Sequence, residues 1–221
     1  MNSEKKRGLS RWLCLLGTVS LISYTAAVVF SPLAYPDYDW LSQAVSDLSA
    51  MSAPSLSLWN RLSALYMPCG IVCCTVCCID AAGRYNKCLR TGVYLFAAMN
   101  WLSAVGYAMF PLTEAGAPSD FQGIMHMVVT AGVVLLSVGS LTLIGIGGLR
   151  GGTAAGLGRW AVFFLCMMLL GAVGTGVVPS EYFGIPERMS VFAATGFNAV
   201  LGIYFFKGQK YEQKSDTHNR R

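Results

Sequence analysis

The stretch that decides the fold is residues 123–146, which read GIMHMVVTAGVVLLSVGSLTLIGI and contain no Lys, Arg, Asp or Glu. A bilayer core about 30 Å thick is crossed by about 20 apolar residues in a helix. Lipid offers a backbone amide no partner outside its own segment, so an apolar run of this length is expected to be helical. The stretch therefore predicts a membrane-spanning helix.

Five further apolar runs accompany it, in a chain that is 54% hydrophobic and only 12% charged. Alternating segments of about 10 residues, as in a β-barrel, do not occur. We therefore predict an all-α integral membrane protein, a six-transmembrane-helix bundle that forms a single domain over residues 1–221. The tail at 207–221 is polar and is predicted to be disordered. The predicted spans cover about residues 12–31, 58–79, 91–110, 123–146, 157–178 and 189–206.

The charges between these runs alternate in sign. Of the 16 basic residues, 14 fall in the two termini and in or beside the second and fourth connections, a bias that places those parts in the cytoplasm. The net charge of +5 is thus a topology signal, attracted to anionic inner-leaflet lipid, and predicts no nucleic-acid partner. The three connections on the other side are acidic and hold Asp37, Asp39, Asp47, Glu114, Asp120, Glu181 and Glu187.

The first outer connection, residues 32–57, is the longest. Between Asp39 and Ser52 its apolar residues recur with a helical period, which predicts a short amphipathic helix lying over, or dipping into, the outer mouth of the bundle. A simple interfacial cap is an equally good interpretation. The predicted inward side consists of Leu41, Ala44, Val45, Leu48 and Ser52.

The eight cysteines all lie outside the outer connections, so a disulfide framework is not expected. The run at 73–78 contains a formal C-x-x-C, but neither a histidine nor a second such pair accompanies it. Free cysteine packs as a small hydrophobe, which we take as its role here. We predict no metal site and no cofactor.

His126 is the sharpest polar feature, because ionisable side chains at membrane depth are costly. It is the only histidine outside the C-terminal tail, and it shares one helix face with Gln122 and Thr130 at i, i+4 spacing. Ser119 and Gln122 fit a capping box that would begin this helix. A hydrogen-bonded structural role for His126 is the alternative.

Arg188 is the second such feature, since a cation at a helix N-terminus opposes the helix dipole. It should therefore have an anionic partner, for which Asp47, Glu114 or a lipid phosphate would serve. An internal ion pair between outer connections competes with ligand binding as the interpretation. In the predicted third span Asn100 and Tyr107 lie on one polar stripe, although such residues often only join helices.

The pattern resembles the six-span bacterial membrane proteins grouped as a domain of unknown function, DUF998. This resemblance implies a membrane location and six spans, and it implies no activity. A more distant comparison is with the seven-span metal-dependent lipid hydrolases related to alkaline ceramidase. It is less favoured, because those need about three His ligands and an Asp, and His126 with Asp47 and Glu114 would be an unusual set. The segments that carry the resemblance are Ser31-Pro32-Leu33 through Tyr38-Asp39, Ser46-Asp47-Leu48-Ser49-Ala50, Phe110-Pro111, Phe121, His126, and Gly184 through Glu187-Arg188.

Three functions follow as hypotheses. The first is an outward-facing site in the bacterial cytoplasmic membrane that binds or modifies a lipid or lipid-linked substrate. The second is a small transporter or channel subunit, and the third is a structural or accessory protein without catalysis. Whether the protein is an enzyme is left open, membrane lipids are its expected partners, and the sequence names no protein partner. In the first hypothesis the candidate catalytic residues are His126, Asp47 and Glu187, and the candidate substrate-binding residues are Arg188, Asp39, Glu114, Tyr107 and Asn100.

Overall fold

The structure is a computed structural model that describes residues 2–116, 120–152 and 154–218. Helices make up nearly all of its regular structure, and no strand occurs in these three ranges. In chain order the elements are α1 (Asn2–Cys14), α2 (Leu16–Phe30), η1 (Ser31–Ala34), η2 (Ser46–Ser49), α3 (Leu56–Leu62), α4 (Tyr66–Ala81), α5 (Lys87–Met109), α6 (Phe121–Gly151), α7 (Ala155–Val177), η3 (Ser180–Tyr182) and α8 (Gly184–His218).

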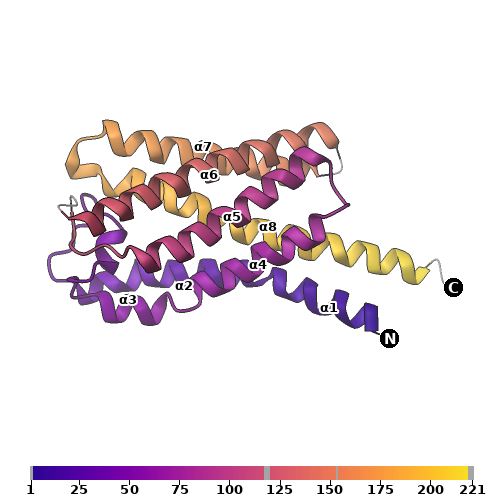
Figure 1. The fold of residues 1–221 in the computed structure, drawn as a ribbon, viewed down its shortest axis with the longest axis horizontal. Helices are drawn as coiled ribbons and strands as arrows, with labels where there is room; N and C mark the ends of the chain where they lie inside the picture. The colour runs from indigo at the N-terminus through magenta and orange to yellow at the C-terminus, as the bar shows by residue number, and fades with distance from the viewer. Residues whose placement is uncertain (1, 117–119, 153, 219–221) are drawn as a thin grey trace.

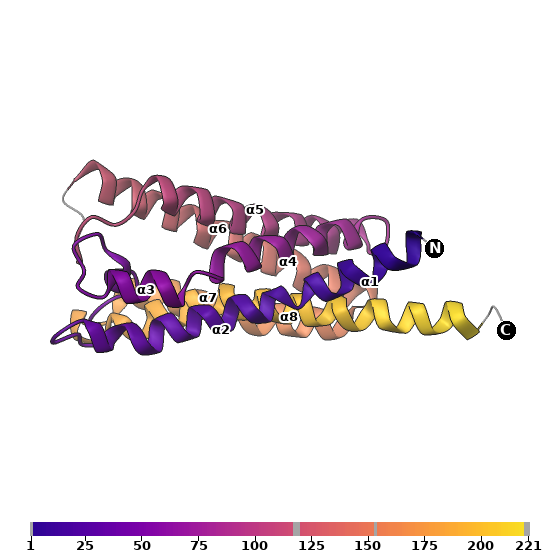
Figure 2. The ribbon, with the colours of Figure 1, turned by 90° about the horizontal axis from the view of Figure 1, so that it is seen from below.

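The long helices run roughly along one axis (Figure 1). One end, which we call the acidic end, holds the connections 31–55 and 178–183 and the residues 110–116. The other end, which we call the terminal end, holds the N-terminal part of α1, the C-terminal part of α8, the connection 82–86 and the C-terminal end of α6. Helix α8 contacts α7, α2 and α4. Figure 2 shows α5 and α6 on the opposite side of the bundle from α2.

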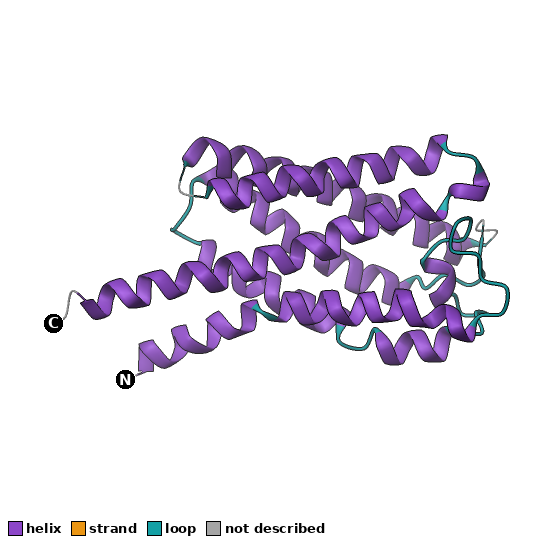
Figure 3. Ribbon diagram, turned by 180° about the vertical axis from the view of Figure 1, so that it is seen from behind, coloured by secondary structure: helices purple, strands orange, loops and turns teal. Residues whose placement is uncertain are grey.

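Among the described residues, five segments are long and apolar enough to cross a membrane, which supports a membrane-helical protein. They are Gly8–Ala34, Leu56–Ala81, Phe121–Arg150, Ala155–Val177 and Ser180–Gly208. The helix predicted at 91–110 is present as α5, but this less apolar helix, which carries Lys87, Arg90 and Asn100, falls outside that set. Figure 3 shows helices filling the length of the molecule, with loops at its two ends.

The second predicted span, 58–79, lies within the apolar segment Leu56–Ala81, but its helix is interrupted. It is divided into α3 and α4 at residues 63–65. Pro68 lies in the first turn of α4, where its missing N–H costs nothing. Carbonyl groups near the break receive hydrogen bonds from α2, since Ser23 Oγ donates to Leu62 O at 2.6 Å and Ser20 Oγ donates to Tyr66 O at 2.7 Å.

The prediction of an amphipathic helix between Asp39 and Ser52 was wrong. Only the four-residue turn η2 is helical there, and it is a 3-10 helix. The side chain of Asp39 accepts from Leu41 N and from Ser42 Oγ, and that of Asp47 accepts from Ala44 N. Short side chains that bond nearby backbone in this way compete with helix formation.

The predicted inward side of this segment is nevertheless largely correct. Ala44, Val45 and Leu48 are buried, while Leu41 is half-buried and Ser52 is exposed. Val45 packs with Tyr24 and Val28 of α2. The apolar pattern therefore marks which residues face the bundle, although the backbone between them is irregular.

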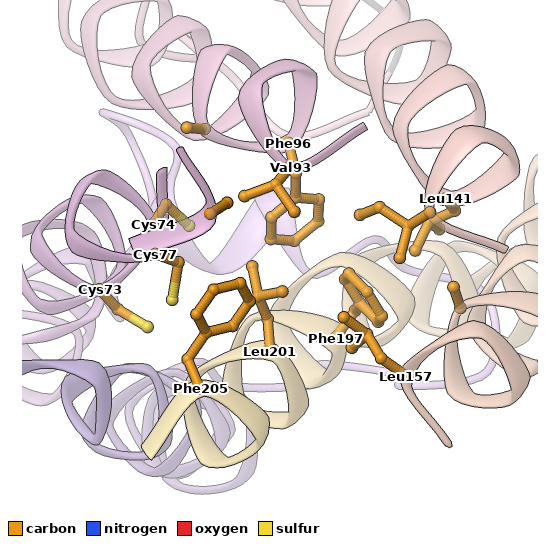
Figure 4. Close-up of a cluster of buried hydrophobic side chains, with 14 of the residues drawn as sticks. Cys73, Cys74, Cys77, Val93, Phe96, Leu141, Leu157, Phe197, Leu201 and Phe205 are labelled. Atoms are coloured by element: carbon orange, nitrogen blue, oxygen red, sulfur yellow. The ribbon is translucent and has the colours of Figure 1, made fainter. Parts of the chain in front are cut away.

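The main core lies towards the terminal end and contains cysteines among its apolar side chains (Figure 4). Cys73, Cys74 and Cys77 of α4 are fully buried against Phe205 and Leu201 of α8 and their neighbours. All eight cysteines are free thiols. This packing agrees with the role as small hydrophobes that the sequence indicates.

The disorder predicted for the tail at 207–221 stays a prediction, since residues 219–221 lie outside the described part of the chain. The backbone of α8 continues as a helix to His218. Extending a helix that is already formed avoids the cost of nucleation, and the tail is rich in Lys, Gln and Glu, which favour helix.

Candidate functional site

The N-terminus of α8 is where the first acidic-end connection meets the bundle. Gly184 N donates to Leu41 O at 2.7 Å. A Cβ placed on Gly184 would collide with Trp40 O and would lie 2.7 Å from Gln43 O, so only glycine allows this close approach. The connection is thereby fixed against the first turn of α8.

Arg188 holds the same connection from the next turn. Its Nη1 donates to Gln43 O at 3.0 Å and to Gly184 O at 2.8 Å, and its Nη2 donates to Tyr38 Oη at 2.6 Å. All three acceptors are neutral oxygens. Among the described residues no carboxylate forms a salt bridge with this guanidinium, so the protein anion that the sequence analysis considered for it is not there.

Tyr38 completes the contact by donating from its hydroxyl to Ala44 O at 2.8 Å. The guanidinium carbon of Arg188 also lies 5.9 Å from the centre of the Tyr38 ring. Burial raises the pKa of Tyr38 to about 12, against the opposing effect of the Arg188 charge. The hydroxyl is therefore protonated at neutral pH and acts as donor and acceptor at once.

The two acidic residues near Arg188 bind backbone N–H groups. Glu187 Oε2 accepts from Val45 N at 3.1 Å. Asp47, only 5% exposed, accepts from Ala44 N at 3.0 Å and from Gly116 N at 3.1 Å, and so joins the first and second acidic-end connections. We call Tyr38, Asp47, Glu187 and Arg188 the loop clamp, because each of them binds the backbone of the connection at residues 43–45.

His126 lies elsewhere, between α6 and the C-terminal end of α5. Its Nδ1 lies 2.9 Å from Phe110 O, and its ring stacks on Tyr107 with centroids 4.7 Å apart. A carbonyl only accepts, so Nδ1 carries the proton and Nε2 is the acceptor of the neutral ring. His126 is 7% exposed and shares no hydrogen bond with the loop clamp.

The predicted face of α6 packs against α5. Gln122 Nε2 donates to Met109 O at 3.0 Å, and Thr130 Oγ1 lies 3.1 Å from Tyr107 Oη. The residue that caps α6 is Asp120, whose Oδ1 accepts from Gly123 N at 2.8 Å. Ser119, the cap that the sequence suggests, lies outside the described residues.

Asn100 is separate from both groups and sits within the bundle. Its Oδ1 accepts from Asn198 Nδ2 at 3.2 Å, and Asn198 Oδ1 lies 3.1 Å from Cys74 Sγ. Asn198 is 2% exposed. These side chains join α4, α5 and α8 and show no contact with the acidic end.

Two of the candidate residues are at the surface. Glu114 is exposed, and so is Asp39, whose carboxylate is bonded within its own turn. The hydrogen bond from Ser42 holds the pKa of Asp39 below its ordinary value. Across the described ranges, no group of three or more His, Cys, Asp or Glu side chains is placed to hold a metal ion.

The structure thus brings three candidates together, Asp47, Glu187 and Arg188, and leaves His126 with Tyr107 in a second group. Sequence reasoning missed Tyr38 and Gly184 as members of the first group. Their partners stand up to 150 positions away in the chain, and only the resemblance segments pointed to both.

The cation of the loop clamp, Arg188, has more N–H donors than it has acceptors among the described residues. A guanidinium carries five N–H donors. Three of them are used in the contacts to Gln43, Gly184 and Tyr38, so Nε and one hydrogen of Nη2 are left. Arg188 is half-buried, which leaves these donors within reach of an anion.

No curated protein and no solved structure matches the chain. The family model described as "Protein of unknown function (DUF998)" matches residues 8–204, which is most of the chain. The chain therefore belongs to the DUF998 family of proteins of unknown function.

Proposed function

We propose that this membrane-helical protein binds a lipid or lipid-linked molecule with an anionic headgroup at its acidic end, with Arg188 as the anchoring residue. The observation that carries the proposal is the set of neutral oxygens around Arg188. A guanidinium whose positive charge no described carboxylate pairs with, and which keeps two N–H donors, is suited to a phosphate or carboxylate.

Access through the lipid is favoured over access from water. The connections of the acidic end carry a negative field, to which the exposed Asp39, Glu114 and Glu181 contribute. Such a field repels a freely dissolved anion. A headgroup that diffuses sideways within the leaflet reaches Arg188 without crossing the exposed acidic surface, and this is why a lipid is the proposed ligand class.

Catalysis has less support than binding. His126, proposed as a general acid or base, shares no contact with Arg188, and its Nδ1 is taken by Phe110 O. Asp47 and Glu187, its proposed helpers, bind backbone N–H groups of the connection. The proposed activity is therefore recognition of the headgroup, and Tyr107, Asn100, Asp39 and Glu114 are left with no part in it.

We further propose that six helical segments, α5 included, cross the bacterial cytoplasmic membrane with both termini in the cytoplasm. The excess of basic residues in the termini, at Arg84, Lys87 and Arg90, and at Arg150 and Arg159 supports this orientation. Fusions of a periplasm-dependent and a cytoplasm-dependent reporter after residue 208 and within 111–116 test it. Cytoplasmic activity at 111–116 would overturn the proposed topology.

The binding proposal is tested by native mass spectrometry of the purified full chain with phosphatidylglycerol or phosphatidylcholine added. Arg188→Gln is expected to lose about five-fold in affinity for one phosphatidylglycerol, as about 1 kcal/mol per surface cation implies. Arg61→Gln is the matched control, because Arg61 is an exposed cation of α3 near the same end. Equal loss in both variants, or no loss in Arg188→Gln, would overturn the proposal.

Arg188→Gln also removes bonds to the connection, so a second variant separates binding from folding. Tyr38→Phe removes an acceptor of Arg188 and keeps the charge. It is expected to retain the phosphatidylglycerol. Loss of lipid in Tyr38→Phe equal to that in Arg188→Gln would show a structural clamp alone, and the protein would then be a structural or accessory one.

A further inference from the structure

Arg11, at the terminal end, lies against aromatic rings of two helices. Its guanidinium carbon lies 4.3 Å from the centre of the Phe206 ring in α8 and 5.8 Å from that of its neighbour Trp12 in α1. The two rings are themselves 5.3 Å apart. The contact thus joins α1 to α8.

The hydrogen bonding of Arg11 is incomplete. Its Nε is buried and has no hydrogen-bond partner. Within the described part of the chain, the contacts of Arg11 are those with the two rings, and no carboxylate pairs with it. An N–H of a charged group left without an acceptor is costly.

The position of Arg11 near the end of α1 explains why a cation is favoured there, but it does not explain why the guanidinium lacks hydrogen-bond acceptors. A cation in the last turn of a helix is favoured by the helix dipole. The dipole supplies no acceptor for the guanidinium nitrogens, however, and aromatic faces supply none either. An oxygen-rich anion would supply acceptors to the terminal nitrogens Nη1 and Nη2, which are not among the buried atoms without a partner, as Nε is.

The surroundings indicate the source of that anion. Trp12 is 62% exposed, and a tryptophan exposed at the end of an apolar segment is typical of the headgroup level of a bilayer. Lys207, the residue after Phe206, is exposed and adds a second positive charge at this end of α8.

We propose that Arg11, oriented by Trp12 and Phe206, binds the phosphate of an anionic membrane phospholipid at the terminal end, with Lys207 as an additional cation. This site is at the opposite end of the bundle from Arg188, and it does not depend on the function proposed above.

The test is native mass spectrometry of the full chain with phosphatidylglycerol, phosphatidylcholine or inorganic phosphate as the probe. Arg11→Gln is expected to bind one phosphatidylglycerol about five-fold more weakly than the wild type. Arg159→Gln is the matched control, because Arg159 is an exposed cation of α7 at the same end. It is expected to bind as the wild type does.

Three outcomes would overturn the proposal. They are equal binding by Arg11→Gln and the wild type, equal weakening in Arg11→Gln and Arg159→Gln, and binding of inorganic phosphate as strong as that of the lipid. The double variant Arg11→Gln, Arg188→Gln separates the two sites. If the double variant binds phosphatidylglycerol more weakly than Arg11→Gln alone, the further loss belongs to the site at Arg188.

If Arg11→Gln lowers the yield of folded protein, Arg11→Lys replaces it. Lysine keeps the charge but loses the planar fork that the rings orient. This variant is expected to retain phosphatidylglycerol less well than the wild type. Equal retention would overturn a site built by the guanidinium.

Discussion

Arg188 Nη2 donates to Tyr38 Oη at 2.6 Å, and the same hydroxyl donates to Ala44 O at 2.8 Å. One tyrosine hydroxyl therefore connects the start of α8 to the middle of a long connection. The relationship ties residues 150 positions apart and makes the loop clamp a tertiary feature.

Tyr38→Phe is expected to destabilise the protein by about 1–2 kcal/mol, because it leaves an N–H of Arg188 and the carbonyl of Ala44 without this partner. Thermal unfolding in detergent measures the effect. Tyr35→Phe is the control, since the Tyr35 ring lies 5.5 Å from the Tyr38 ring and none of its recorded hydrogen bonds uses the hydroxyl. Equal effects of the two variants would contradict the role of the Tyr38 hydroxyl.

Asp47→Asn is expected to cost about 1–3 kcal/mol, because an amide presents one acceptor where Ala44 N and Gly116 N need two. Limited proteolysis of the connection 110–120 should speed up as the bond to Gly116 is lost. Glu114→Gln, at an exposed position in the same connection, should leave the cleavage rate unchanged. Unaltered cleavage in Asp47→Asn would show that the link between the two connections contributes nothing.

The turn at Asp39 is expected to loosen in acid. Its pKa is lower in the folded turn than its ordinary value, so the unfolded turn binds more protons. The stabilisation is present above the ordinary pKa and is lost as pH falls through the folded one. Hydrogen exchange of residues 39–43, compared with Asp39→Asn at each pH, should show an advantage for the wild type that shrinks as the pH falls below the ordinary pKa of an aspartate, about 4. A constant advantage would contradict this titration.

Gly147→Ala is expected to destabilise the packing of α6 on α5 by about 1–3 kcal/mol, because its Cβ would collide with Leu89 N and lie 2.7 Å from Leu89 Cα. Gly139→Ala in the same helix meets nothing within 4 Å. It should stabilise by up to about 1 kcal/mol through helix propensity. The difference between the two melting temperatures measures the close approach, and equal values would refute it.

The amide pair within the bundle is expected to be modestly coupled. A double-mutant cycle with Asn100→Ala and Asn198→Ala should give a coupling of about 0.6 kcal/mol, the usual size for a hydrogen bond between membrane helices. Unfolding in mixed micelles measures it. Strict additivity of the two single variants would show that the contact of 3.2 Å adds no stability of its own.

The sequence predicted the helical segments well because their signal is local. The run at 123–146 carries its own apolar length, and α6 contains it entirely. The break at 63–65 could not be predicted, because it depends on Ser20 and Ser23 of another helix supplying hydrogen bonds. The helix prediction for the first acidic-end connection failed for a local reason. Its apolar period was real, but the side chains of Asp39 and Asp47 accept hydrogen bonds from nearby backbone N–H groups.

For the candidate site too, the sequence identified single residues but not their contacts with other segments. Charge at membrane depth was enough to single out Arg188 and His126. The expected meeting of these two residues in one site is absent from the described contacts, because His126 binds Phe110 O and Arg188 binds Gln43 O. Spacing along a single helix predicts which residues share a face, but the partner on another segment is set by how the helices pack.

The divided second segment has a consequence for biogenesis. Leu62 O receives its bond from Ser23, and Tyr66 O receives one from Ser20, so a lone α3–α4 segment would enter lipid with these bonds unmade. In the folded protein the first two hydrophobic segments therefore complete each other's hydrogen bonding, and we expect them to depend on each other during insertion.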